Sequence, residues 1–445
     1  MTTSYGTSDV IDNIKSTLMS RDNIKTASSI VLLFLYQLMM LTTVTTISPA
    51  NADAYRSIFL LSYVLAILPV VITRAIRADP IPAAAVGFLV ESGLAFQATI
   101  SEDYNGNRMV IYLSIFAILA TIFFQRRVWE RVKAQSKLLF FAYVASTAIL
   151  GITGVGMRLC LSPQNGAYCW MYVGGISIQA TELLKLLYLI TLFIAARISK
   201  SDKELFIKTL LPTATVSVAL VLVNEGGTLV LCVATWLVTL FFLTENAKHL
   251  MSEFGIVFAC GTFGLFSLAV FRKLFAGKNG ILGTIYAFSD KVFTRIFAVI
   301  SSENTDTYQI DRAMKAFRQG KLLGTDSDYL TSIPEHSNDM ILASVTARFG
   351  APICAFIIIA FAAFMIAAIR RYQNDDRGTM LIISSTSLFL QALIVVFSNL
   401  NIAPVVGLTL PLISSGWSSF IISCAIFTLA LMSMGDSNTI TKREA

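Results

Sequence analysis

The chain has 445 residues, of which 55% are hydrophobic and only 14% are charged. These values exclude a soluble globular domain, whose charged fraction is about a quarter, and they indicate a polytopic membrane protein. The net charge of +7 does not indicate nucleic acid as a partner. Lys and Arg are concentrated in short loops between apolar segments, as the positive-inside rule predicts for a membrane protein.

Apolar runs near the spanning length of roughly twenty residues predict an all-α fold with about twelve transmembrane helices. The runs begin near Ala27, Ile58, Ile81, Met109, Leu138, Leu183, Leu205, Thr228, Gly255, Ala351, Met380 and Trp417. Glu91 interrupts the third run, and the eighth is short. The residues before Ala27 are polar with mixed charge, so we expect no cleavable secretory signal.

The orientation of the helices follows from the basic loops. Clusters of cations recur at every second connection, at Arg74 and Arg77, Arg126 to Lys137, Arg197 to Lys203, and Arg370 and Arg371. The positive-inside rule places these connections in the cytoplasm. Because the number of helices is even, both tails, residues 1–26 and 435–445, are expected to be cytoplasmic as well.

A long loop, residues 272–338, separates the ninth helix from the tenth and falls on the outer side in this topology. Its segments Gly283 to Ile300 and Gln309 to Arg318 have amphipathic patterns, which suit short helices at the outer leaflet. A substrate platform and a solvated lid without chemistry both fit this composition.

The six cysteines fall into two groups. Cys160 and Cys169 share an outer loop, so an oxidising compartment would permit a disulfide between them, and the sequence does not decide whether it forms. The others lie in apolar helices, where free Cys is normally an inert core residue, at Cys232, Cys260, Cys354 and Cys424. The chain has no CxxC motif and only two histidines, so we predict no protein metal site.

Four segments carry polar residues where a spanning helix normally carries Leu or Val, and the topology places all four at outer helix ends. In the first, Asn165 to Lys185, Glu182 and Lys185 are three residues apart and share a helical face. One interpretation is a buried ion pair that only neutralises itself. The other is an ammonium that holds a pyrophosphate, kept charged by the carboxylate.

In the second segment, Val223 to Val230, Gly226 and Gly227 interrupt the apolar pattern beside Glu225. A broken helix at membrane depth lines a polar cavity or packs inside protein, but a plain tight turn also fits.

In the third segment, Ile333 to Gly350, Glu335, His336 and Asp339 precede an apolar helix. Asp339 is the candidate catalytic residue. Helix-start residues favoured by the helix dipole are the other interpretation.

The fourth segment, Pro404 to Phe420, contains two prolines, two glycines and four serines. Such a composition predicts a kinked or re-entrant hairpin, although a flexible connection between the last two helices also fits.

Taken in order, these segments resemble the SEDS family, the membrane glycosyltransferases of shape, elongation, division and sporulation. Trp170, Gly174 and Gln179 to Lys185 are similar to the family's tryptophan, glycine and Gln-Pro-Ser-Glu-Leu-x-Lys. Pro334 to Leu342 resembles Pro-Glu-Ala-His-Thr-Asp-Phe-Ile-Phe, and Gly407 to Ser414 resembles Gly-x-x-Leu-Pro-x-Ile-Ser. The stretch from Tyr308 and Gln309 to Gly320 and Gly324 also follows the family.

The resemblance implies a peptidoglycan glycosyltransferase of the bacterial plasma membrane, active in elongation or division. A sugar hydroxyl of one lipid II would attack the anomeric carbon of another and expel undecaprenyl pyrophosphate. A class B penicillin-binding protein is the implied transpeptidase partner. Asp339 would be the base, and the implied substrate contacts are Glu182, Lys185, Gln309, Glu335, His336, Ser414 and Ser415. Lys185 or a divalent cation, Mg or Mn, would neutralise the leaving group.

The resemblance covers about residues 80–434 and leaves two extra helices, residues 27–79, as in actinobacterial RodA-like proteins. Departures from the family pattern are Ala180 for proline, Glu225 for aspartate, a shifted His336, Ala347 and Arg348 for paired glutamates, Val395 and Phe397 for Asn and Gly, and Ser415 to Trp417 for Tyr-Gly-Gly. A polymerase of another lipid-linked glycan and a non-catalytic scaffold are alternatives. A precursor flippase is another, and it requires ionisable residues at mid-helix depth, where only Glu91 qualifies.

Overall fold

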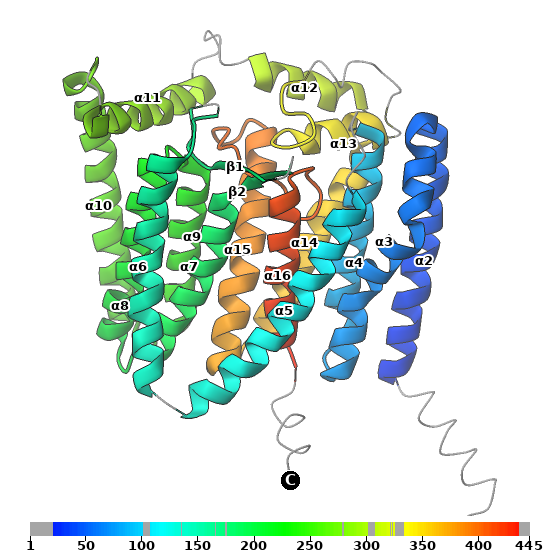
Figure 1. The fold of residues 1–445 in the computed structure, drawn as a ribbon, viewed down its shortest axis with the longest axis horizontal. Coiled ribbons are helices and arrows are strands. Elements are labelled where there is room, and N and C mark those ends of the chain that lie inside the picture. The colour runs from blue at the N-terminus through cyan, green and yellow to red at the C-terminus, as the bar shows by residue number, and fades with distance from the viewer. Residues whose placement is uncertain are drawn as a thin grey trace, which may run out of the picture.

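The computed structural model describes residues 21–100, 107–134, 136–164, 166–173, 176–277, 280–300, 308–320, 322, 324 and 333–435. The tail residues 1–20 and 436–445, Gly174 and part of the outer loop lie outside this part of the chain. Within it, helices form one bundle, and three further helices and a β-hairpin gather across one end of that bundle (Figure 1).

All twelve predicted segments are helical in the structure. They are α2 (Arg21–Ile47), α3 (Pro49–Ala75), α4 (Pro80–Ile100), α5 (Asn107–Ala134), α6 (Ser136–Cys160), α7 (Ala180–Arg197), α8 (Asp202–Leu222), α9 (Gly226–Leu243), α10 (Ala247–Leu274), α14 (Ala351–Arg371), α15 (Asp376–Asn399) and α16 (Trp417–Ser433). Among the described residues, ten helices are long and apolar enough to cross a membrane. The exceptions are α7, which carries three charges in 18 residues, and α16, which has 17 residues. A multi-pass all-α membrane protein is therefore confirmed, and the count of twelve spans stays a prediction.

Local sequence accounts for several helix boundaries. Ser201 caps α8 by accepting a hydrogen bond from the Glu204 backbone N–H, and Asp375 caps α15 in the same way. Proline occupies the first turn of α3 and α14, where its missing N–H costs nothing. Glu91 does not interrupt α4, which is continuous over 21 residues, because Glu is a good helix former; its side chain is buried next to Tyr55 of the extra helices.

The elements across the bundle end are α11 (Gly280–Ile300), α12 (Tyr308–Gly320), α13 (Ile341–Phe349) and a hairpin of β1 (Trp170–Val173) and β2 (Ile176–Gln179) (Figure 1). Helices thus occupy both segments with predicted amphipathic patterns. In α12 the buried positions are Ile310, Ala313, Ala316 and Gly320, which repeat every three or four residues. The antiparallel hairpin was not predicted from the sequence.

The segment between α15 and α16, residues 400–416, is not helical and runs back into the protein. Leu410, Leu412 and Ile413 in its middle are almost completely buried. Its close approach to α4 requires Gly93, since a Cβ there would lie 1.7 Å from the carbonyl oxygen of Leu412. The sequence-based interpretation of a re-entrant segment agrees with this course.

The extra hairpin of α2 and α3 packs mainly on α4, and α3 also contacts α5 and α16. It lies at one edge of the bundle (Figure 1). The start of α2 and the end of α16 lie at the bundle end opposite α11, α12 and α13.

Candidate functional site

Asp339 lies in a tight turn immediately before α13, at the bundle end that α11, α12, α13 and the β-hairpin cover. The backbone N–H groups of Asn338 and Met340 both donate to the carbonyl oxygen of Glu335, each at 3.1 Å. Glu335 adopts a left-handed conformation with φ of 53°. The turn therefore folds back on Glu335. This exposed residue lies close enough to the half-buried Asp339 for its charge to act on the Asp339 carboxyl.

The re-entrant loop binds this turn through its two serines. The Ser415 backbone N–H donates to the Ser337 carbonyl at 2.9 Å, and its hydroxyl donates to Asn338 Oδ1 at 2.6 Å. Ser414 Oγ donates to the Asn338 carbonyl at 2.8 Å. Ser414 and Ser415 thus hold the chain next to Asp339.

A residue that the sequence analysis missed, Asn399, holds Asp339 from the other side. Its Nδ2 donates to the Asp339 carbonyl at 2.7 Å, and its Oδ1 accepts the Ala343 N–H at 3.3 Å. Asn399 is fully buried at the end of α15. A signal was present, because Asn399 follows Val395, where the family pattern has Asn, by one helical turn.

A second carboxylate and two cations lie near Asp339. Glu225 occupies the break before α9, where it is the buried N-cap residue and the Thr228 backbone N–H lowers its pKa. Lys291 of α11 donates from Nζ to the Asn224 carbonyl at 2.8 Å. Arg295 follows Lys291 by one helical turn. Both cations lower the pKa of Glu225 and of Asp339 through their charge.

These surroundings shift the ionisation of both carboxyls. Burial raises the pKa of Asp339 to about 7, with a further increase from Glu335 and Glu225 and opposition from Arg295 and Lys291. Burial also raises the pKa of Glu225 to about 7, against Lys291 and Arg295. Burial lowers the pKa of Lys291. A carboxyl that titrates near neutral pH is suited to accepting a proton from a substrate.

Glu182 and Lys185 form an enclosed ion pair in the first turns of α7. Lys185 Nζ lies 2.5 Å from Glu182 Oε2 and donates to Gln391 Oε1 at 2.9 Å. Gln391 in turn donates from Nε2 to the Thr409 carbonyl of the re-entrant loop at 2.8 Å. The side chain of Lys185 is only 2% exposed. In this conformation its ammonium links α7, α15 and the loop and does not reach the surface.

The remaining candidate residues lie on the outside of the turn. Gln309 of α12 donates from Nε2 to the Pro334 carbonyl at 3.4 Å, and His336 is half-buried in the turn itself. The structure thus brings Gln309, Glu335, His336 and Asp339 together, with Glu182 and Lys185 in the interior.

The structure describes the two cysteines considered for a disulfide and the groups that could bind a metal ion. Cys160 and Cys169 are both free thiols, the first exposed and the second buried. Burial raises the pKa of Cys169 to about 12, so the thiol stays protonated. In the part of the chain that the structure covers, no group of three or more His, Cys, Asp or Glu side chains is placed to hold a metal ion. The divalent cation stays a prediction.

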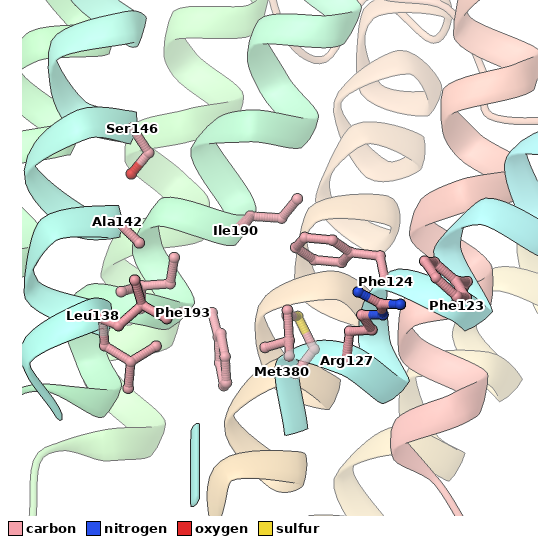
Figure 2. Close-up of a pocket in the computed structure, with 12 residues that line it drawn as sticks. Phe123, Phe124, Arg127, Leu138, Ala142, Ser146, Ile190, Phe193 and Met380 are labelled. Carbon is pink, nitrogen blue, oxygen red and sulfur yellow. The ribbon is translucent and has the colours of Figure 1, made fainter. Parts of the chain in front are cut away.

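An apolar cavity of about 470 Å³ lies near the opposite bundle end, between α5, α6, α7 and α15 (Figure 2). Phe123, Phe124, Phe193 and Met380 are among its lining residues, and Arg127 lies at one side. It contains none of the candidate site residues. Its lining suits hydrocarbon rather than the polar centre of a glycosyl transfer.

Comparisons with known proteins are consistent with the resemblance. A family model described as a cell cycle protein, FtsW/RodA/SpoVE, matches residues 81–438. The chain is 25% identical over 349 residues to the "Probable peptidoglycan glycosyltransferase FtsW" of Borreliella burgdorferi, covering 74% of this chain and 87% of that protein. It is 27% identical over 344 residues to the protein of the same name from Idiomarina loihiensis, covering 72% and 75%.

Solved structures show the same fold. A chain of the structure titled "Structural coordination of polymerization and crosslinking by a peptidoglycan synthase complex" matches with a TM-score of 0.60 and 19% identity, covering 80% of this chain and 97% of that one. A variant of the rod shape determining protein RodA of Thermus thermophilus matches with a TM-score of 0.50 and 20% identity, again covering 80% and 97%.

The enclosed ion pair predicts a specific pattern of stability. Lys185→Met should lower the free energy of unfolding by roughly 3–5 kcal/mol, because it leaves Glu182 buried without its cation. Adding Glu182→Gln should restore most of the loss. Denaturation in detergent of wild type, both single variants and the double variant measures the coupling. A double variant as unstable as Lys185→Met would show that the pairing is not what the lysine provides.

Proposed function

Because this chain belongs to the FtsW/RodA/SpoVE family, we propose that it is a peptidoglycan glycosyltransferase that polymerises lipid II. Curated relatives carry the name peptidoglycan glycosyltransferase. The observation that supports this activity most directly is the half-buried Asp339, beside a second carboxylate and two cations at one end of a membrane bundle.

In the proposed reaction, Asp339 is the general base. Its carboxylate accepts the proton of the attacking sugar hydroxyl while the new bond forms between that oxygen and the anomeric carbon of the second lipid II. The bond from this carbon to undecaprenyl pyrophosphate breaks, and the electron pair leaves with the phosphate oxygen. A pKa near 7 leaves a large fraction of Asp339 ionised at neutral pH, while the base stays strong enough to take the proton.

We assign neutralisation of the leaving pyrophosphate to Lys291 and Arg295. They are one turn apart on the amphipathic helix α11, so they share a face, and both lie close enough to Asp339 to alter its pKa. Lys185, one of the two alternatives considered from the sequence, is enclosed by Glu182 and Gln391 instead. Its proposed role is to hold the re-entrant loop in place.

The predicted divalent cation fits this centre in one respect. Mg²⁺ usually takes one or two carboxylates and completes its shell with water and substrate phosphates. Asp339 and Glu225 would hold it, and Glu225 Oε1 is buried without a hydrogen-bond partner in the described part of the chain. Such an ion would supply positive charge to the pyrophosphate. No step above depends on it.

The surroundings of Glu91 favour polymerisation over transport of lipid-linked precursors. Glu91 lies near the middle of α4, but it is fully buried between α4 and the extra hairpin, next to Tyr55. A route for a charged headgroup would need ionisable residues that line a polar path at this depth.

We further propose that the bundle end with α11, α12 and α13 faces the outside of the bacterial plasma membrane, with both tails cytoplasmic. Lipid II and the growing glycan would then meet Asp339 at the outer surface. The proposed partner is a class B penicillin-binding protein, because one structural neighbour was solved in a complex for polymerisation and crosslinking.

Asp339→Asn tests the proposed function. It keeps the size of the side chain and removes the base, so it should lower polymerisation by at least about a hundredfold. The assay measures glycan chains from labelled lipid II, with purified protein alone and with a cognate transpeptidase. Asp311→Asn, on the exposed side of α12, is the control. Equal polymer from wild type and Asp339→Asn would remove Asp339 as the base, and no polymer from wild type with its partner would favour the scaffold.

The pH profile of polymerisation should depend on Glu335. Since only ionised Asp339 accepts a proton, the rate should rise with pH through about 7 and then level off. Glu225 titrates in the same range, so the rising limb reports both carboxyls. Glu335→Gln removes a negative charge that raises the pKa of Asp339, and it should shift the limb to lower pH. A limb that stays in place, as expected for Asp311→Asn, would contradict the electrostatic coupling.

Lys291→Gln should weaken substrate binding without unfolding the protein. Loss of a charged hydrogen bond to the pyrophosphate should raise KM for lipid II roughly tenfold or more. Lys273→Gln, at an exposed position near the end of α10, should leave KM unchanged. Initial rates at varied lipid II concentrations measure both. An unchanged KM for Lys291→Gln would show that a cation other than Lys291 binds the pyrophosphate.

A further inference from the structure

The extra hairpin of α2 and α3 contacts the helix that follows Asp339. The hairpin precedes residue 81, where the match to the family model begins. The helix that follows Asp339 is α13, which has only nine residues. A helix this short is marginal by itself in solution, so its position depends on its packing against α12 and α14 and on the contacts at its two ends.

Different parts of the molecule hold the two ends of α13. Asn399 holds the first turn, through the Ala343 N–H and the Asp339 carbonyl. At the other end, the guanidinium of Arg348 donates to the Ile47 carbonyl at 3.3 Å. Ile47 is the last residue of α2, where carbonyl groups have no partner within the helix and favour a cation.

Arg348 is the one residue of α13 that is not buried. Its guanidinium therefore extends away from the packed faces of α13 and reaches the extra hairpin at Ile47.

Polar contacts fix the hairpin on the core. The hydroxyls of Tyr36 and Ser92 are hydrogen-bonded at 2.7 Å, and Asn51 Nδ2 donates to the Ala98 carbonyl at 2.7 Å. These contacts join α2 and α3 to α4 at different depths. Directional bonds at separate points oppose sliding of the hairpin, so the Ile47 carbonyl is a fixed anchor for Arg348.

We propose that the α2–α3 hairpin is a built-in positioning element for Asp339 and that Arg348 transmits its effect through α13. The hairpin holds the last turn of α13 while Asn399 holds the first, and the two contacts together set the position of the Asp339 carboxylate. Arg348 is a positioning residue in this arrangement. The effect on catalysis rests on the proposed function, but the effect on α13 does not.

The test uses the full-length protein with two readouts, hydrogen exchange of the α13 amides and the kinetics of lipid II polymerisation. Arg348→Ala should increase exchange across α13 and lower kcat by about tenfold with KM nearly unchanged, because displacement of a base affects the chemical step. Arg348→Lys keeps a donor and should recover much of both. Arg108→Ala is the matched control, since Arg108 of α5 also donates to a hairpin carbonyl, that of Ser57 at 3.4 Å, away from α13.

Coupling between sites separates positioning from a general loss of stability. Asn51→Ala loosens the hairpin near Ile47, so its effect on kcat should be much smaller in the Arg348→Ala background than in wild type. Arg108→Ala should behave additively. Equal losses of kcat for Arg348→Ala and Arg108→Ala, or unchanged exchange of α13 in Arg348→Ala, would overturn the proposal. If wild type makes no polymer, the proposed function fails, while the exchange measurement still decides the positioning role.

Discussion

The site depends on the hydrogen bonding of a non-helical backbone segment buried among apolar helices. Each unpaired peptide group at this depth costs several kcal/mol, which is a large part of the stability of a protein. The peptide groups of the re-entrant loop therefore need hydrogen-bond partners from the protein. Gln97 and Gln391 supply two of them by donating to the Ser414 and Thr409 carbonyls. Once the loop is fixed, its serines fix the turn that carries Asp339, so the position of the carboxylate follows from the satisfaction of the loop.

The helices could be predicted because apolar length is a strong signal, and helices occur at all twelve segments. The re-entrant loop could be predicted from prolines, glycines and serines inside an apolar stretch. The β-hairpin could not, because β1 and β2 have only four residues each, they pair mainly with each other, and β2 also packs on α16. The cations of α11 were also missed, since an amphipathic pattern at the outer side does not say which residues of the helix come close to Asp339.

The ion pair shows the limit of local reasoning most clearly. The spacing of Glu182 and Lys185 predicts that they are neighbours, and they are. Whether their ammonium faces a substrate or a third side chain depends on Gln391, which is 206 positions away in the sequence from Lys185. A local sequence pattern cannot reveal a contact between residues so far apart in the chain. The same holds for Asn399, whose carboxamide meets Asp339 only after α15 and α13 have packed together.

Gly407 occupies a position beside Asp339 where few other residues are tolerated. Its backbone has φ of 69°, which disfavours any side chain, and a Cβ there would stand 3.5 Å from Asp339 Oδ2. The positive φ is thus the constraint at this position, and a side chain there would contact the Asp339 carboxylate. Replacement of Gly407 by alanine would strain the backbone beside Asp339 and leave every ionisable group in place. A related sequence can therefore retain all the acidic and basic residues of the site and still encode an inactive enzyme. Inspection of the charged positions alone would wrongly predict that it is active.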